Sequence, residues 1–325
     1  MRKRYTAALA GAVLAVAGCV VYAGTPDSGQ AGGIGPPGAV SLLLSAPAAA
    51  PSSALKAPPL IVFYTEHSCA NGGDVGSCGN SELAVVADDG SHFDQLTHNH
   101  VTERWPAWSA DHRLIAYSRG SPPHIWVMDA DGSHQRPLRL QARPGERLRE
   151  SAWSPDGRRL AVSEWTGTDF RIFLYDIATG QRRPLRPALD QETSPEWSPD
   201  GTQIAFTAWT YHAGLQVYIS SVEGRRWRRI SHCVHGGCGA PSWSPDGRRI
   251  AYSCNGSVCV TPAAAARPQI VTRSGSDPAW SPDGRWIAFA GSYGDIYVVR
   301  PDGTRQHRVA KRSSDQTRVN LDPDW

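Results

Sequence analysis

The sequence predicts an all-β fold, a six-bladed β-propeller, from a repeated unit, from its period and from the lack of helical patterning. The unit is "WSPDGRRLAV" at Trp153, and its copies, including the divergent "WSADHRLIAY", begin at Trp197, Trp243, Trp280 and Trp108. Counting Trp325, these tryptophans lie 45, 44, 46, 37 and 45 residues apart, a period that suits a four-stranded blade. No window between them places apolar residues at helical spacing.

Each unit reads as four strands in a constant order. "WSPDG" ends the first strand in a tight turn, because proline presets φ and glycine accepts the closing conformation. The second strand alternates apolar residues, as in Ile204 and Phe206. A third apolar run, such as "RIFLYDIATG" from Arg171, ends in a turn signal, and a polar outer strand such as "RRWRRIS" from Arg225 comes last.

The two ends of the repeat region predict how the ring closes. "PLIVFYTE", residues 59–66, matches the second strand of a unit, but no "WSPDG" precedes it. "VNLDPDW", residues 319–325, matches a first strand with nothing after it. Together they complete a sixth blade, so we expect strands from both ends to close the propeller over residues 59–325 and to leave no free sheet edge between blades.

The repeats resemble those of the TolB-like (PD40, WD40-like) propeller family, whose signature is a PxWSPDGxxIAF-like unit. That signature is reproduced by Pro195, Trp197, Ser198, Pro199, Asp200, Gly201, Ile204, Ala205 and Phe206. The resemblance implies the fold over about residues 59 to 325, with the Trp packed between blades. In some members of the family an α/β domain precedes the propeller, whereas here we expect a tether in that place. The role of such members in the Tol–Pal envelope system is therefore not carried over whole.

The first residues have the pattern of an export signal. "MRKRYTAALAGAVLAVAGC" has a basic start, an apolar run too short for a comfortable membrane span, and small residues before Cys19. "VAGC" resembles the bacterial lipobox, which implies a lipoprotein signal peptide over residues 1–18 and a lipid on Cys19. Cleavage after "VYA", which would discard Cys19, is the alternative. Residues 19–58 are rich in Ala, Gly, Pro and Ser and predict a flexible tether with a span on the order of 35 Å.

The balance of basic and acidic residues bears on whether the partner is a nucleic acid. The chain has 33 basic and 30 acidic residues, and the excess lies within residues 1–18. The remainder is neutral, which argues against a nucleic-acid groove, since that would need a clustered basic surplus.

Six cysteines of the propeller fall into three local pairs, as expected for disulfides in an exported chain. The predicted pairs are Cys69–Cys78, Cys233–Cys238 and Cys254–Cys259. Zinc bound by "HCVHGGC", alone or with the third pair, is the alternative. "DADGS" at Asp129 resembles the start of a calcium loop but lacks the later acidic ligands, so we expect no cofactor or metal.

The segments before each repeat Trp vary where the scaffold does not, and they should meet at one mouth of the central channel. A variable polar and aromatic set on a rigid ring is typical of a binding surface. The candidate residues are His98, His100, Glu103, Arg104, Trp105, Arg147, Arg149, Glu150, Gln191, Glu192, His232, His235, Arg273, Asp277, Asn320 and Asp322.

We therefore expect a lipid-anchored envelope protein, in the periplasm or on the outer cell surface, that binds a protein or glycan partner without catalysis. The alternative is a metal-assisted lyase or hydrolase in the channel mouth. It rests on "THNHVTERW", residues 97–105, because some sugar-acid lyases resemble this propeller and use histidines there with a metal. No G-x-S-x-G motif supports a serine hydrolase.

Overall fold

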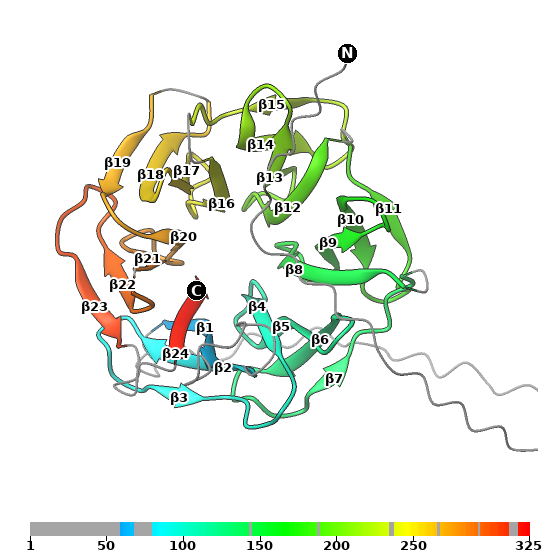
Figure 1. Cartoon of the computed structure of the whole chain (residues 1–325), viewed down its shortest axis with the longest axis horizontal. Helices are drawn as coiled ribbons and strands as arrows, with labels where there is room; N and C mark the ends of the chain where they lie inside the picture. Colours follow the sequence, from blue (N-terminus) through cyan, green and yellow to red (C-terminus); the bar gives the residue numbers. More distant parts are fainter. Residues whose placement is uncertain are drawn as a thin grey trace, which may run out of the picture. The chain divides into compact units, whose positions relative to one another are not determined.

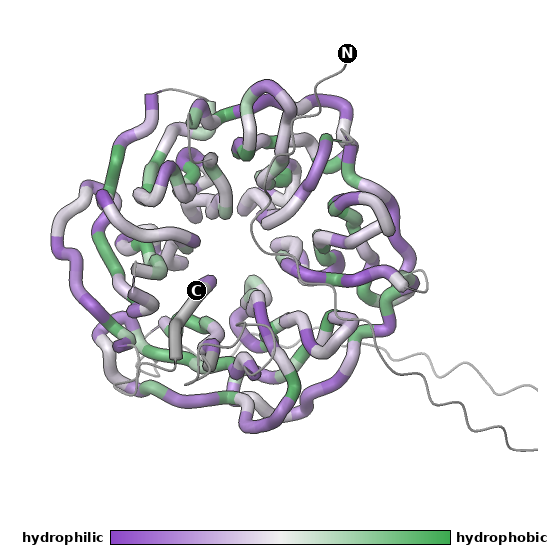
Figure 2. Tube along the Cα trace, in the orientation of Figure 1, coloured by the Kyte–Doolittle hydropathy of each residue, from purple (hydrophilic) through white to green (hydrophobic). Residues whose placement is uncertain are grey.

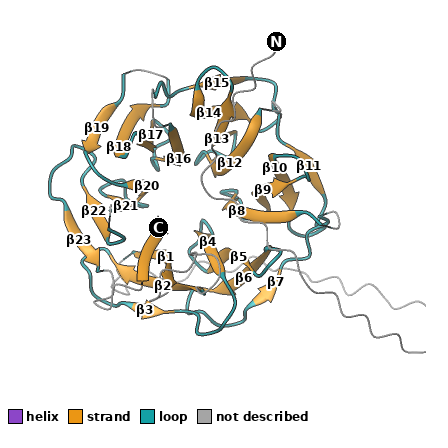
Figure 3. Ribbon diagram, in the orientation of Figure 1, coloured by secondary structure: helices purple, strands orange, loops and turns teal. Residues whose placement is uncertain are grey.

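Six four-stranded antiparallel sheets surround a central axis in the computed structural model (Figure 1). The structure describes residues 59–67, 80–142, 145–186, 189–233, 237–264, 267–291, 293–311 and 318–325. Figure 3 shows strands and loops throughout this part of the chain and no helix. The described part accordingly has no helix with the length and apolarity that crossing a membrane requires. Cys19, Cys69, Cys78, His235 and the side chain of Asn320 lie outside the described residues.

Each blade is one sheet whose first strand lies at the axis and whose fourth lies at the circumference (Figure 1). Blade 1 has β4 (Glu103–Trp108), β5 (Leu114–Arg119), β6 (His124–Asp129) and β7 (Arg136–Pro137). Blade 2 has β8 (Arg147–Trp153), β9 (Arg159–Trp165), β10 (Phe170–Asp176) and β11 (Arg182–Pro184). Blade 3 has β12 (Asp190–Trp197), β13 (Gln203–Thr210), β14 (Gly214–Ser221) and β15 (Trp227–Arg229).

The remaining blades complete the ring. Blade 4 has β16 (Cys238–Trp243), β17 (Arg249–Cys254), β18 (Ser257–Pro262) and β19 (Gln269–Thr272). Blade 5 has β20 (Ser276–Trp280), β21 (Ile287–Ala290), β22 (Ile296–Val299) and β23 (His307–Ala310). Blade 6 has β24 (Arg318–Asp324), β1 (Leu60–His67), β2 (Ser81–Ala87) and β3 (Asp94–Gln95).

The predicted closure by strands from both ends is confirmed in blade 6. β24 pairs with β1, with Val62 opposite Asp324 and Tyr64 opposite Leu321. The sheet order β24-β1-β2-β3 places the last strand of the chain innermost, at the position that β4 or β8 holds in its own blade. The propeller is therefore a closed ring of six blades.

Local hydrogen bonds formed by the motif residues themselves stabilise each "SPDG" turn. In blade 2, Ser154 Oγ donates to Asp156 Oδ1 and accepts from the backbone N–H of Arg159 (2.9 Å). Asp156 Oδ1 also accepts from the N–H of Arg158, and Gly157 has a φ of +67°, in the left-handed region that favours glycine. The same bonds recur in the other complete turns, so each motif residue has a structural function.

The repeat tryptophans form part of the packing between blades. Trp197 is 4% exposed and packs with Ala161, Ile172 and Leu174 of blade 2, and Trp325 packs in the same way against blade 5. Figure 2 shows apolar residues distributed over all six blades rather than gathered in one layer. These apolar clusters, including the one that closes the ring, lie within the described residues from 60 onward.

The two ends of the ring differ in what they carry. The N–H of Val222, which begins the β14–β15 turn, donates to the carbonyl of Thr202, which follows the "SPDG" turn of the same blade (3.0 Å). These two kinds of turn therefore share one end, which we call the turn end. Leu60 pairs with Ala87, just before the β2–β3 turn, so the chain enters the propeller at the turn end. The inner strands begin at the opposite end, which we call the mouth.

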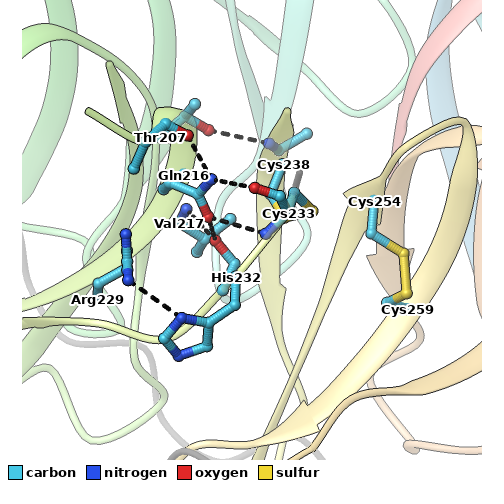
Figure 4. Close-up of a disulfide and its surroundings, with 12 residues drawn as sticks. Thr207, Gln216, Val217, Arg229, His232, Cys233, Cys238, Cys254 and Cys259 are labelled. Carbon is cyan, nitrogen blue, oxygen red and sulfur yellow. Dashed lines mark hydrogen bonds between the residues drawn. A yellow bond between two sulfur atoms is a disulfide. The ribbon is translucent and has the colours of Figure 1, made fainter. Parts of the chain in front are cut away.

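Two of the predicted disulfides are present in the described residues. Cys233–Cys238 joins the segment after β15 to β16, with Cα atoms 5.7 Å apart, and Cys254–Cys259 spans the β17–β18 hairpin at 6.0 Å. Figure 4 shows Gln216 holding the first bridge, since its amide donates to the carbonyl of Cys233 (2.8 Å) and accepts from its N–H. His232 faces Arg229 instead, with Nδ1 3.2 Å from Nη2, so the zinc alternative does not match this arrangement.

Candidate channel-mouth site

The six inner strands line a narrow central cavity of about 120 Å³. Four of the predicted site residues line it: Trp105, Glu150, Asp277 and Asp322. A cavity of this size holds a few waters or one side chain, whereas pockets that enclose a small-molecule ligand typically measure about 300–1,000 Å³. The geometry suits a surface that receives one protruding group.

A repeated backbone irregularity aims these residues at the axis. Trp105 (φ +52°), Asp277 (φ +53°) and Asp322 (φ +46°) have left-handed backbones, as do Ser194 and Ala240 at the matching positions. The register of the inner strand shifts at the same place, for example between Arg104 and Ala107. A bulge of this kind reorients a side chain. The left-handed backbone is uncommon for a bulky residue such as tryptophan, and strained positions of this kind cluster at functional sites.

Trp105 forms one end of a row of aromatic and cationic side chains that we call the aromatic ledge: Trp105, Arg149, Phe170 and Trp165. The guanidinium carbon of Arg149 lies 5.5 Å from the ring centroid of Trp105 and 4.5 Å from that of Phe170. The rings of Phe170 and Trp165 lie 5.2 Å apart. All four side chains are partly exposed, and burial lowers the pKa of Arg149. The ledge therefore offers a row of aromatic surface beside a guanidinium group.

Two predicted mouth residues are buried instead, and for them the expectation was wrong. Glu103 is fully buried, and its Oε1 accepts from Asn99 (2.9 Å) and lies 3.3 Å from Arg119 Nε. Glu192 is also fully buried and accepts from the backbone N–H groups of Ile172 (3.1 Å) and Leu189 (2.8 Å). Burial raises the pKa of Glu192 to about 7. Both carboxylates hold loops in place.

Arg104 is engaged away from the ledge. Its Nη2 lies 2.6 Å from Glu66 Oε1, and its Nε donates to Ser81 Oγ (3.1 Å). Arg104 therefore ties β4 to blade 6, and Arg149 supplies the cation of the ledge.

The other predicted residues do not converge on one point. His98, His100, Arg147, His232 and Arg273 are exposed and Gln191 is half-buried; His100 Nδ1 lies 3.4 Å from Asn80 Nδ2. Because Glu103 faces Asn99 and Arg119, "THNHVTERW" does not assemble the histidine–carboxylate set that the lyase alternative needs. Within the described ranges, no group of three or more His, Cys, Asp or Glu side chains is arranged to hold a metal ion.

Two further acidic residues of the cavity, Glu196 and Asp324, were missed by the sequence reasoning. A signal for them was present, since they stand directly before Trp197 and Trp325, where the other units have Ala or Ser. Asp324 Oδ2 accepts from the N–H of Trp108 (2.7 Å), which links blade 6 to blade 1.

The cavity thus concentrates five carboxylates: Glu150, Glu196, Asp277, Asp322 and Asp324. Burial raises the pKa of Asp322 well above its ordinary value, and the carboxylate of Asp277 raises it further. Burial also raises the pKa of Glu196, with a smaller contribution from Asp324, and raises that of Asp324 to about 6. The channel is an acidic environment whose charge a cationic group would complement.

These shifts predict that the propeller is more stable at mildly acidic than at neutral pH. A carboxyl whose pKa is raised by folding binds more protons in the folded state, so its destabilising effect fades as the pH falls toward about 5. The turn aspartates act in the opposite sense: the hydrogen bond from Ser154 lowers the pKa of Asp156 below 3.8, so its contribution is lost only at lower pH. The melting temperature, measured across pH, should therefore reach a maximum between two ranges: the higher one, in which the buried carboxyl groups titrate, and the lower one, in which the turn aspartates titrate.

The double variant Glu196→Gln with Asp324→Asn should flatten the neutral side of this profile, while Asp190→Asn, at an exposed position of β12, should leave it unchanged. A parental slope retained in the double variant would contradict the assignment to the channel.

Part of the chain is similar to known proteins. A family model described as the TolB beta propeller domain matches residues 124–270. Over 62 residues, 19% of this chain, the sequence is 39% identical to the Tol-Pal system protein TolB of Coxiella burnetii, and the match spans 14% of that protein.

Solved structures share the fold. TolB from Acinetobacter baumannii superimposes with a TM-score of 0.67 at 19% identity, over 82% of this chain and 66% of that one. An oligogalacturonate lyase in complex with manganese matches with a TM-score of 0.53 at 17% identity, over 72% of each chain. At such identities the likeness shows the fold alone. The chain is therefore a six-bladed β-propeller whose residues 124–270 match the model of the TolB beta propeller domain.

Proposed function

We propose that the channel mouth binds a protein partner of the cell envelope without catalysis. The observation that carries this proposal is the ledge, where Trp105 is held in a left-handed backbone with Arg149 stacked on it. Aromatic and arginine side chains dominate the energetics of protein interfaces. An envelope partner is supported by the matched relative, which is named as a Tol-Pal system protein.

The mouth suits a segment with an apolar or aromatic side chain beside a cationic one. The apolar side chain would lie on the ledge, and the cation would enter the acidic channel, which has room for about one side chain. A glycan would use the aromatic rings, but it would not supply the cation that favours the ionised form of the five carboxyl groups, whose pKa values burial raises. The geometry therefore favours a protein over a glycan.

The test is capture of the partner from an envelope extract by the parent chain and by the variant Trp105→Ala with Arg149→Ala. We expect the variant to bind on the order of 100-fold more weakly, because each truncation removes a central contact. The matched control is Phe93→Ala with Arg136→Ala, an exposed aromatic and an exposed arginine on other blades. Trp105→Asn, which tolerates a left-handed backbone, provides a second ledge variant if the first melts early.

Equal capture by the parent and both ledge variants would exclude the mouth as the site. Captured material that survives protease treatment would point to a glycan and contradict the choice of a protein.

Export and lipid anchoring at Cys19 belong to the same proposal and rest on the sequence of residues 1–19. The intact mass of the mature chain should correspond to a diacylated or triacylated protein that begins at Cys19. A mature chain that begins at Gly24 would instead mean cleavage after "VYA".

A further inference from the structure

A second surface stands at the junction of blades 2 and 3, and we call it the basic rim. Its six residues are all exposed, five arginines around one tryptophan whose exposed fraction is 48%. They are Arg183 and Arg186, on and after β11, and Arg225, Arg226, Trp227 and Arg228, in and after the β14–β15 turn. Arg228 extends the rim toward blade 4, where its Nη2 donates to the carbonyl of Ala263.

Contacts between the two blades hold these segments together. Arg183 Nη1 donates to the carbonyl of Val222 (3.0 Å), and Ser220 Oγ donates to the carbonyl of Arg186 (2.7 Å). Gly224 (φ +69°) presses against Arg186 so closely that a Cβ there would collide with that residue's backbone. The rim is therefore a constant feature of the fold, although its two halves lie about 40 positions apart in the sequence.

The charge of the basic rim is largely uncompensated. None of its five arginines forms an ion pair with a carboxylate within the described ranges. By contrast, Arg113 and Arg285, in turns of other blades, pair with Asp111 and Asp283. One acid, Glu223, lies in the same turn and lines, with Arg226, Trp227 and Arg228, a groove of about 440 Å³.

The basic rim includes the β14–β15 turn, which lies at the turn end, where the chain enters the propeller at Leu60. The 59 residues that precede Leu60 are therefore joined to the same end as the rim, and the channel mouth lies at the opposite end.

We propose that the basic rim docks the propeller on a membrane surface by binding the phosphate groups of anionic phospholipids. Guanidinium groups bind phosphate oxygens with two hydrogen bonds, and tryptophan favours the boundary between headgroups and acyl chains. Each arginine near an anionic bilayer increases partitioning about fivefold. The proposal does not depend on the ledge, because docking at the turn end would leave the mouth free for a partner.

The test uses residues 55–325, which form one compact unit, so that no lipid or apolar N-terminal segment contributes. The protein is sedimented with vesicles of phosphatidylcholine alone and with vesicles that also contain phosphatidylglycerol. We expect binding to the second kind only, weakened by added salt. Arg225→Glu with Arg226→Glu should reduce it by at least about tenfold.

The matched control is Arg147→Glu with Arg273→Glu, the same charge change at exposed positions at the mouth end, where β8 begins and after β19. We expect it to bind like the parent. An equal loss in the control would mean that net charge alone drives binding, and this would overturn the proposal. So would equal binding by the parent and the rim variant, or binding to soluble polyphosphate but not to vesicles. Aggregation of the rim variant with vesicle binding unchanged would show that the arginines serve only to keep sheet edges apart.

Discussion

Removal of Val319 to Trp325 should open the ring and lower the melting temperature by more than about 10 °C. The deletion takes away the innermost strand of blade 6 and exposes the inner edge of β1, whose residues Ile61, Val62 and Phe63 are fully buried. It also removes Trp325, which is 5% exposed and packs against blade 5. Truncation of one buried tryptophan typically costs about 3–5 kcal/mol.

Two point variants separate the contribution of Trp325 packing to stability from the contribution of strand β24. Trp325→Ala should retain β24 but lower the melting temperature by roughly 10 °C, whereas Trp227→Ala, at an exposed position, should change it little. Thermal melts followed by circular dichroism provide the measurement. A deletion variant that melts like the parent would mean that β24 does not close the ring.

Replacement of Arg182 by Met should destabilise the propeller by about 3–5 kcal/mol, because it leaves a buried carboxylate without its cation. Glu164 is fully buried and pairs with Arg182 Nη1, while Arg182 Nη2 lies 2.9 Å from Glu146 Oε1. The hydroxyl of Tyr175 donates to Glu164 and accepts from Arg182 (3.2 Å). Glu146 stands directly before β8, the strand that carries Arg149, so this network also supports the ledge.

The adjacent Arg183 gives a matched control, since it is exposed and donates only to a carbonyl among the described residues. Arg183→Met should cost less than about 1 kcal/mol. Adding Glu164→Gln to Arg182→Met should recover part of the loss, because the buried charge is removed. Equal melting temperatures for the two single variants would show that the network contributes little to stability.

The fold was predictable because its signals are local. Ser154, Asp156 and Gly157 make their turn through bonds that span at most five residues, and the same letters repeat the same turn. The alternation of apolar residues determines which face of each strand is buried. The spacing between the repeat tryptophans indicates a blade of four strands. The unmatched half-units at residues 59–66 and 319–325 predicted the closing blade, since each supplies strands that the other lacks.

The candidate site was predictable only in part. Trp105 was identified because it breaks the pattern of its own repeat, and its row with Arg149 follows from the neighbouring position of blades 1 and 2. Phe170 and Trp165, which extend that row, sit in a hairpin whose sequence carries no signal of a ledge.

The sequence by itself determined the ring, its blade count and the place of the channel mouth, because turns and alternation are properties of neighbouring residues. The tertiary structure decided which of the candidate side chains face the axis and which other side chains join them. The bulge in each inner strand shifts the register, and a shift of one residue exchanges the two faces of a strand. For that reason Glu196 and Asp324 line the channel, whereas Glu103 and Glu192, a few positions earlier in the same kind of strand, are buried among loops. The basic rim likewise exists only because folding places the segment after β11 beside the β14–β15 turn.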